Sequence, residues 1–563
     1  MIEESQGVIS PITATTFQAI DPTVGEKLSN SIELLADKDS GKADDVENGN
    51  HQEDSKKLDN SSDQHLHGFA LLSCSLSLLV CLFLTALDQT VIITMLTKVG
   101  QQFGEFGKVS WLSTGFLLPP AVLSLSWGNI AVIFGRKYAI LIAIVLFEIG
   151  SLICAVSNSM NMLIAGRVVA GIGGGAVQGT VFMIMTEIVP LAKRGTLSGL
   201  VGLAYVAASA VGPLIGGAFT DNVSWRWNFY INLPLGGIAF ASMFYFFNPP
   251  RTPGTLREKI FRIDYVGNLL LASSLTLILV AVTLGSIGES WGSAKLITFF
   301  AVGGTLLVAF CIYNFRFSKN PLISKTLYRY PGVLLPCISF LGIFGAYIGS
   351  LLYLGTYFLI VRDHSALQSG IDLFPVVIPD VLSFLLTGAI ISRCRWTKPF
   401  TLLGPTLFSI GMGLCTTMNE TTSTAKTVGY LLILGSGVGT SFQSISLNLQ
   451  LATPKENDGV LHTAAMLGFT RNIGGMLGST IGQMIENLVF VSQLRANGFE
   501  GDYNYNLLGS PDRIYSLPSN ERQIAIASFV KAFQATMYFS LALSLFSFVC
   551  SLFLTNKRIE KDE

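Results

Sequence analysis

Residues 199–219 read GLVGLAYVAASAVGPLIGGAF, an uncharged apolar stretch long enough to cross a bilayer as one helix. Small residues share one face of that helix, because they recur at every fourth position: Ala204, Ala208, Gly212 and Gly216. Lipid tails supply no hydrophobic drive between helices, so close packing depends on small residues that let backbones touch. Pro213 removes a backbone donor inside the run. The stretch predicts a transmembrane helix that packs tightly and can still bend, or, as the alternative, a packing helix without a special role.

The composition of the whole chain is that of an integral membrane protein. Of its 563 residues, 50% are hydrophobic and 13% are charged, whereas soluble domains carry about 25% charged residues. The net charge is zero, which gives no sign of a nucleic-acid partner. The eight cysteines include no CxxC pair, so we expect neither a metal site nor a disulfide framework.

Apolar runs of spanning length follow one another along the chain. They lie near residues 69–96, 110–134, 138–157, 162–186, 197–220, 229–247, 265–284, 296–315, 333–359, 371–391, 400–416, 428–449, 461–490 and 524–554. By the length that a bilayer requires, these make about fourteen transmembrane helices. The predicted fold class is therefore all-α and membrane-embedded.

The ends of the chain are polar. Residues 1–66 are acidic on balance and poor in aromatic residues, which predicts a disordered tail. Basic residues are concentrated in alternate short loops, including Arg136 and Lys137, which places both termini in the cytosol. On the outer side, Asn419 begins an Asn-Glu-Thr sequence and is a candidate for glycosylation.

Two charged residues interrupt apolar spans at a similar predicted depth. Asp88 lies in the first span and Arg167 in the fourth. An ionisable residue inside the bilayer costs at least about 2.5 kcal/mol and suggests a function. Asp88 is predicted to bind and release a proton, with Arg167 as its partner. A structural hydrogen bond or a purely structural ion pair is the alternative.

Several of these stretches resemble signatures of the fungal fourteen-helix drug:proton antiporters of the major facilitator superfamily, which include yeast multidrug exporters and vacuolar basic amino acid transporters. The segment Gly199, Gly212, Pro213, Gly216 and Gly217 resembles the antiporter signature of the fifth helix, with Ala208 in place of its middle glycine. LDQTV around Asp88 resembles the first-helix signature, and the segment after Arg167 resembles a fourth-helix signature that is implicated there in proton coupling.

The resemblance extends to a cytosolic loop and to a later span. The loop with Gly128, Gly135, Arg136 and Lys137 resembles the superfamily's gate signature, although Val132 occupies the acidic position. Residues 388–398 weakly repeat the sequence of this loop, which indicates two repeated halves. Arg471 precedes closely spaced glycines, as in a corresponding stretch of these transporters. It is a candidate for binding anionic groups, with a structural bond to loop carbonyls as the alternative.

Polar residues on other apolar spans are further candidates. Gln178, Gln443 and Asn448 are predicted to line a cavity between the halves, and Glu148 and Gln450 are similar polar interruptions. Hydrogen bonding between helices is the alternative for each of them.

The resemblance implies a major facilitator fold of two six-helix bundles, at residues 67–248 and 331–555, joined by two extra helices within 249–330. A cytosolic tail would follow at 556–563. It implies alternating access, with protons exchanged for small amphipathic or cationic compounds that leave the cytosol. No phosphate-binding sequence of the G-x4-GK[ST] kind is present, so we expect an ion gradient to drive transport, without a cofactor, metal or enzymatic activity.

Alternatives remain open at this point. Within transport, the substrate could be a basic amino acid loaded into the vacuole or an iron chelate. In a different class, the chain could be a non-transporting membrane sensor that signals through its tail. The plasma membrane is the expected location, with the vacuolar membrane second, and we expect a monomer.

Overall fold

The computed structural model describes residues 68–105, 108–188, 191–249, 252, 254–286, 289–323, 331–453, 459–499 and 514–556. It divides into two units, Met1–Ser73 and Cys74–Glu563, and of the first unit only the opening turns of the first helix are described. The predicted tail at residues 1–66 lies outside the described residues, as do residues 557–563.

The regular elements of the described residues are helices. A first group contains α3 (Gly68–Phe103), α4 (Ser110–Phe134), α5 (Arg136–Ala155), α6 (Met160–Ile188), α7 (Leu191–Asn222), α8 (Trp227–Tyr230) and α9 (Asn232–Phe246). Then come α10 (Leu256–Phe261), α11 (Tyr265–Ser286), α12 (Ala294–Ile312) and a π-helical turn, η2 (Tyr313–Phe317). A second group contains α14 (Pro331–Ile360), α15 (Ala366–Asp372), α16 (Phe374–Cys394), α17 (Lys398–Cys415), α18 (Thr424–Ala452), α19 (Gly459–Ala496) and α21 (Ser519–Leu552).

Twelve of the fourteen predicted spans coincide mainly with one long helix of these described elements, while the span at 229–247 covers α8 and α9 and the span at 371–391 begins in α15 and continues as α16. By length and hydropathy alone, eleven helices in the described part of the chain could cross a membrane. The remaining three are α7, α17 and α19. α17 is 18 residues long and includes Lys398 and two prolines, which lower its mean hydropathy. α7 and α19 mix apolar residues with many glycine and polar ones. Because α7 and α19 pack against other helices, their polar residues can be kept from lipid.

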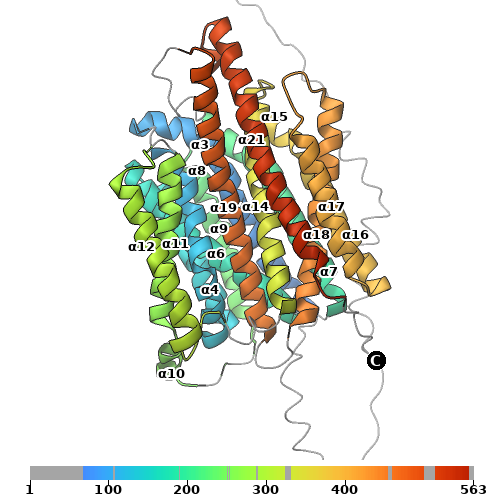
Figure 1. The fold of residues 1–563 in the computed structure, drawn as a ribbon. Helices are drawn as coiled ribbons and strands as arrows, with labels where there is room; N and C mark the ends of the chain where they lie inside the picture. Colours follow the sequence, from blue (N-terminus) through green and yellow to red (C-terminus); the bar gives the residue numbers. More distant parts are fainter. Residues whose placement is uncertain are drawn as a thin grey trace, which may run out of the picture. The chain divides into compact units, whose positions relative to one another are not determined.

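Helices within each group pack mainly on one another (Figure 1). In the first group, α6 contacts α4 and α5, and α5 contacts α9. In the second group, α18 contacts α16 and α17, while α14 contacts α19 and α21. The assignment of exact domain boundaries at residues 248 and 330 stays a prediction.

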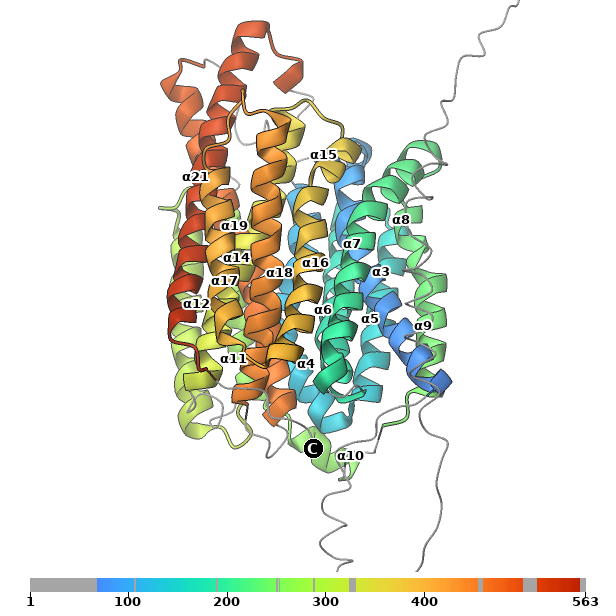
Figure 2. The same ribbon diagram turned by 90° about the vertical axis from the view of Figure 1, so that its right-hand side faces the viewer.

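Two pairs of helices make the most extensive contacts between the groups. α7 of the first group lies beside α16 of the second (Figure 2), and α4 lies against α19. α11 contacts both α4 and α19, and α12 packs on α11. The two extra helices therefore cover one side of the seam between the groups, where Leu279 of α11 joins a cluster with Val122 and Ile473.

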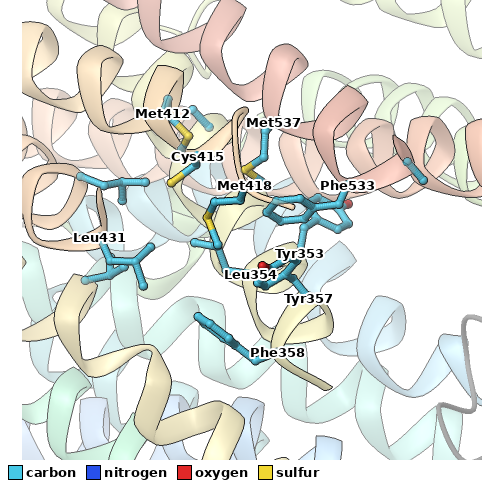
Figure 3. Close-up of a cluster of buried hydrophobic side chains, with 14 of the residues drawn as sticks. Tyr353, Leu354, Tyr357, Phe358, Met412, Cys415, Met418, Leu431, Phe533 and Met537 are labelled. Carbon is cyan, nitrogen blue, oxygen red and sulfur yellow. The ribbon is translucent and has the colours of Figure 1, made fainter. Parts of the chain in front are cut away.

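The second group has a core of aromatic and sulfur-containing side chains. Tyr353, Tyr357 and Phe533 pack with methionines of α17 and α21 (Figure 3). The rings of Tyr357 and Phe533 are 4.8 Å apart between centroids. Since lipid is as apolar as these side chains, the core is held together by van der Waals packing rather than by exclusion of water.

Candidate functional site

Asp88 and Arg167 form an ion pair inside the first helix group. α3 supplies the carboxylate and α6 the guanidinium, and each side chain is only 1% exposed. The Arg167 Nη1 donates to Asp88 Oδ2. The two charged residues that the sequence places at a similar depth therefore lie in contact.

The surroundings of this pair hold both groups in place. Arg167 Nε also donates to the carbonyl oxygen of Leu112 at 3.0 Å, and its guanidinium lies 4.4 Å from the centre of the Phe116 ring. Asn232 of α9 donates to Asp88 Oδ1 at 3.4 Å. Such a pair is stable while both partners are charged, and removal of either charge leaves the other buried and uncompensated.

A separate cavity of about 320 Å³ lies between the two helix groups. Side chains of α3, α4, α6, α7, α14, α16, α18 and α19 line it. Six of the lining residues are aromatic: Phe182, Tyr205, Phe344, Tyr347, Phe384 and Phe442. Asp88 and Arg167 are not part of this lining, whereas Ala86, Gln89 and Thr90 of the same helix α3 are.

The cavity contains one acidic and one basic side chain, Asp380 of α16 and Arg471 of α19. Tyr347 donates its hydroxyl to Asp380 Oδ2 at 2.9 Å. Arg471 Nη2 donates to the Tyr205 hydroxyl at 3.2 Å. Its guanidinium also lies over the rings of Phe182, Tyr205 and Phe344, at 5.5, 5.3 and 4.9 Å from their centres. Arg471 thus reaches from the second helix group to aromatic rings of the first.

The polar residues suggested by the sequence separate into two classes. Gln178 lines the cavity. Gln443 and Asn448 are buried in the second group and are not part of the lining. Gln443 packs against Gly388 of α16, and Asn448 donates to Thr397 Oγ1 at 3.2 Å and to the carbonyl of Thr555 at 2.8 Å. The Asn448 bonds are of the kind that the hydrogen-bonding alternative predicts, whereas Gln443 is placed only by its contact with Gly388.

The glycine face of α7 packs on α3. A Cβ added at Gly212 would collide with Thr90, and one added at Gly216 would collide with Thr94 and Val91. These two glycines therefore allow the close approach that the sequence predicts. Gly199 and Pro213 also lie within α7, and Gly217 has open space beside it.

The rest of the α7 motif completes this contact. Ala208, at the position of the missing glycine, is fully buried, and its carbonyl accepts a bond of 3.2 Å from Thr90 Oγ1. On another side of the helix, Gly202 faces Val381 of α16, and a Cβ there would lie 3.5 Å from the valine side chain. α7 is thus in contact with both helix groups.

The residues of the gate signature lie at the end of α4 and the start of α5. Gly128 packs against Ala465 of α19, which is a contact between the two groups. Gly135 has a φ of +98° at the turn, a conformation that favours glycine. Lys137 donates to the carbonyl of Phe244 at 2.6 Å and to Asn248 Oδ1 at 2.5 Å, so it caps α9. Arg136 begins α5 beside it.

Asn419 is exposed in the connection between α17 and α18. Its Oδ1 accepts hydrogen bonds from the backbone nitrogen of Thr421 at 3.0 Å and from its hydroxyl at 2.9 Å. Its use as a glycosylation site stays a prediction.

Asp380 is the cavity residue that the sequence reasoning missed. It is an acid within the predicted span 371–391, which is the same signal that identified Asp88. No recognised signature surrounds Asp380 in the sequence. Within the described ranges, no group of three or more His, Cys, Asp or Glu residues could hold a metal ion.

Comparison with known proteins finds a matching family model and several similar proteins. The model of the Major Facilitator Superfamily matches residues 78–479. The Saccharomyces cerevisiae protein named Vacuolar basic amino acid transporter 5 is 33% identical, with 77% of this chain and 82% of that protein covered. Azole resistance protein 1 of the same yeast is also 33% identical, with 75% and 77% covered. The rubrofusarin-specific efflux pump aurT of Gibberella zeae is 30% identical, with 88% and 91% covered.

A solved structure shares the fold. The crystal structure of a bacterial homologue of the human lysosomal transporter Spinster, in an inward-facing and occupied conformation, superposes with a TM-score of 0.52. It covers 85% of this chain and 96% of that one, at 16% sequence identity.

Proposed function

The chain belongs to the Major Facilitator Superfamily, and on that premise we propose that it exports small amphipathic cations in exchange for protons. Membership makes it a multi-pass membrane transporter rather than an enzyme. The two helix groups would rock about the central cavity so that it opens to one side of the membrane at a time. The single observation that carries the proposal is Asp380, an acid among the aromatic rings of that cavity.

The cavity supports an organic cation as substrate. Ring faces attract cations, by about 0.5–2 kcal/mol or more where water is excluded. The Asp380 carboxylate would supply the countercharge, held in place by the Tyr347 hydroxyl. The Arg471 guanidinium lies over two of these rings in the structure. A substrate cation would take its place on the rings when the Arg471 side chain moves away.

Proton coupling is assigned to the first helix group. A proton on Asp88 would cancel its charge and leave Arg167 without its partner, which favours a rearrangement of α3 against α6. Because α3 also lines the cavity through Gln89 and Thr90, a shift of this helix would be transmitted to the substrate site. A charge moved across about 100 mV is worth roughly 2.3 kcal/mol, so a proton gradient can drive export.

Basic residues near the ends of the helices support a cytosolic location for both termini. We place the protein in the plasma membrane, as a monomer, for export from the cell. The vacuolar membrane is the second location, and fluorescence of a tagged full-length protein would separate the two.

The proposal is tested with purified protein in liposomes. Uptake of a fluorescent organic cation is compared with and without an imposed pH gradient, across a panel that includes lysine and a neutral analogue of the dye. We expect the pH gradient to drive uptake of the fluorescent cation, but not of lysine or of the neutral analogue. Uptake that is insensitive to the pH gradient would contradict the proton coupling.

A second candidate is transport of a basic amino acid. One acid and one base line the cavity. Asp380 could therefore hold the cationic side chain of a substrate, and Arg471 its α-carboxylate. The yeast relative named for basic amino acids favours this reading. In the same panel, lysine counterflow without dye uptake would identify it.

A further inference from the structure

Glu148 is a half-buried residue whose buried carboxyl group the scheme above does not use. It lies on α5 within the first helix group. Both of its carboxyl oxygens are buried, and neither has a hydrogen-bond partner among the described residues. The carboxyl group packs directly on Gly236 of α9, where any side chain would collide with it. The absence of a Cβ at residue 236 therefore makes the space for this acid.

Glu148 lies about one helical turn along α5 from Ser151, and Asn232 connects Ser151 to the ion pair. Ser151 is three residues further along α5, and Asn232 is four residues before Gly236 on α9. Asn232 Nδ2 donates to Ser151 Oγ at 3.1 Å and to Asp88 Oδ1 at 3.4 Å. Since one helical turn rises about 5.4 Å, a short row of polar groups leads from Glu148 to Asp88.

The charges of the surrounding helices leave Glu148 without a cation of its own. α4, α8 and α9 contain no charged residue. Within the apolar spans of α3, α5 and α6, the other acid, arginine and thiol groups are Cys74, Cys81 and Asp88 of α3, Arg167 of α6 and Cys154 of α5 itself. Lys98, Glu187, Arg136 and Lys137 lie toward the helix ends.

One cation, Arg167, thus stands beside two acids, Asp88 and Glu148, within the apolar spans. Arg167 is bonded to Asp88, and a second, unpaired carboxylate in such a place would be expensive. A single proton on Glu148 makes the group of three residues neutral.

We propose that Glu148 is a second proton-binding residue of this transporter, and that the proton resides on Glu148 while Asp88 is paired with Arg167 and on Asp88 when that pair separates. Transfer of the proton to Asp88 releases Arg167 from its partner and moves the negative charge to Glu148, so the number of protons and charges is unchanged. This inference rests on the proton coupling proposed above. It separates proton binding in the first helix group from substrate binding at Asp380.

Infrared difference spectroscopy of the purified full-length protein reads the proton directly, without substrate. Subtraction of the E148Q spectrum from the wild-type spectrum should reveal the carbonyl stretch of a protonated carboxylic acid, and E148D should retain a shifted band. E289Q makes the same chemical change at an exposed glutamate paired with Lys295, and it should show no such band. A wild-type spectrum without this band would overturn the proposal.

Transport in liposomes tests the exchange. E148Q should lose pH-driven uptake and keep substrate counterflow, which moves no net protons, and E148D should regain part of the driven uptake. Normal driven uptake by E148Q would reduce Glu148 to a structural acid and overturn the exchange. If the wild-type protein itself has no driven uptake, the proposed function fails, while the infrared band still reports whether Glu148 holds a proton.

Discussion

Arg167 on α6 is bonded to Asp88 on α3, and this ion pair is buried in one helix group rather than in the cavity between the two groups. The charged side chains that do face the cavity are Asp380 and Arg471. Under the proposed function, the buried ion pair couples the packing of α3 and α6 to a proton. Asp380 and Arg471 contact the substrate.

Replacement of Asp88 by Asn should remove the partner of a fully buried arginine. A lone buried charge costs about 3–5 kcal/mol, so D88N should unfold at a lower temperature in detergent and lose proton-driven export. The neutral double variant D88N/R167Q should recover most of the stability but none of the driven transport. Full driven export by either variant would exclude the pair from coupling.

Replacement of Asp380 by Asn should weaken the binding of cations and spare neutral ligands. A hydrogen bond or contact to a charged group contributes about 1.5–3 kcal/mol, so cation affinity should fall roughly 10- to 100-fold. Y347F keeps the carboxylate and should have the smaller effect. Tryptophan-quenching titrations with a dye and its neutral analogue provide the measurement, and equal losses for both ligands would argue for a general distortion of the cavity.

A methyl group at Gly212 should disturb the contact between α7 and α3, because it would meet Thr90. Overpacking of this kind costs about 1–3 kcal/mol, which thermal unfolding in detergent can resolve. G217A is the matched control, since nothing lies within 4 Å of a Cβ at that position. Equal stability of the two variants would mean that the glycine face is not required for packing.

A cross-link between α7 and α16 should arrest transport. Gly202 and Val381 face each other across the two helix groups, with 3.5 Å between the added Cβ and a valine methyl carbon, so the thiols of cysteines at both positions would lie near the range in which a disulfide forms. Oxidised G202C/V381C should lose substrate counterflow and regain it on reduction, while each single cysteine variant should be unaffected. Undiminished counterflow in the cross-linked protein would contradict alternating access at this seam.

Much of the fold follows from local properties of the chain. A spanning helix needs about twenty mainly apolar residues whatever its neighbours are, so the predicted spans coincide with the long helices of the structure. The glycines at 212 and 216 indicated a close helix contact because only a small residue permits it. The candidate residues Asp88 and Arg167 were identified by the same logic, since a charge within an apolar span is expensive.

The sequence alone could not decide which side of a helix a polar residue occupies relative to the other helices. Asn448 and Gln178 looked alike in the sequence, yet only Gln178 lines the cavity. The sequence determined which segments enter the membrane, because transfer into lipid depends on each segment's own composition. Only the tertiary structure brought Asp380 and Arg471 to one cavity and Glu148 beside the Asp88 layer, because these proximities depend on how helices distant in the chain pack together.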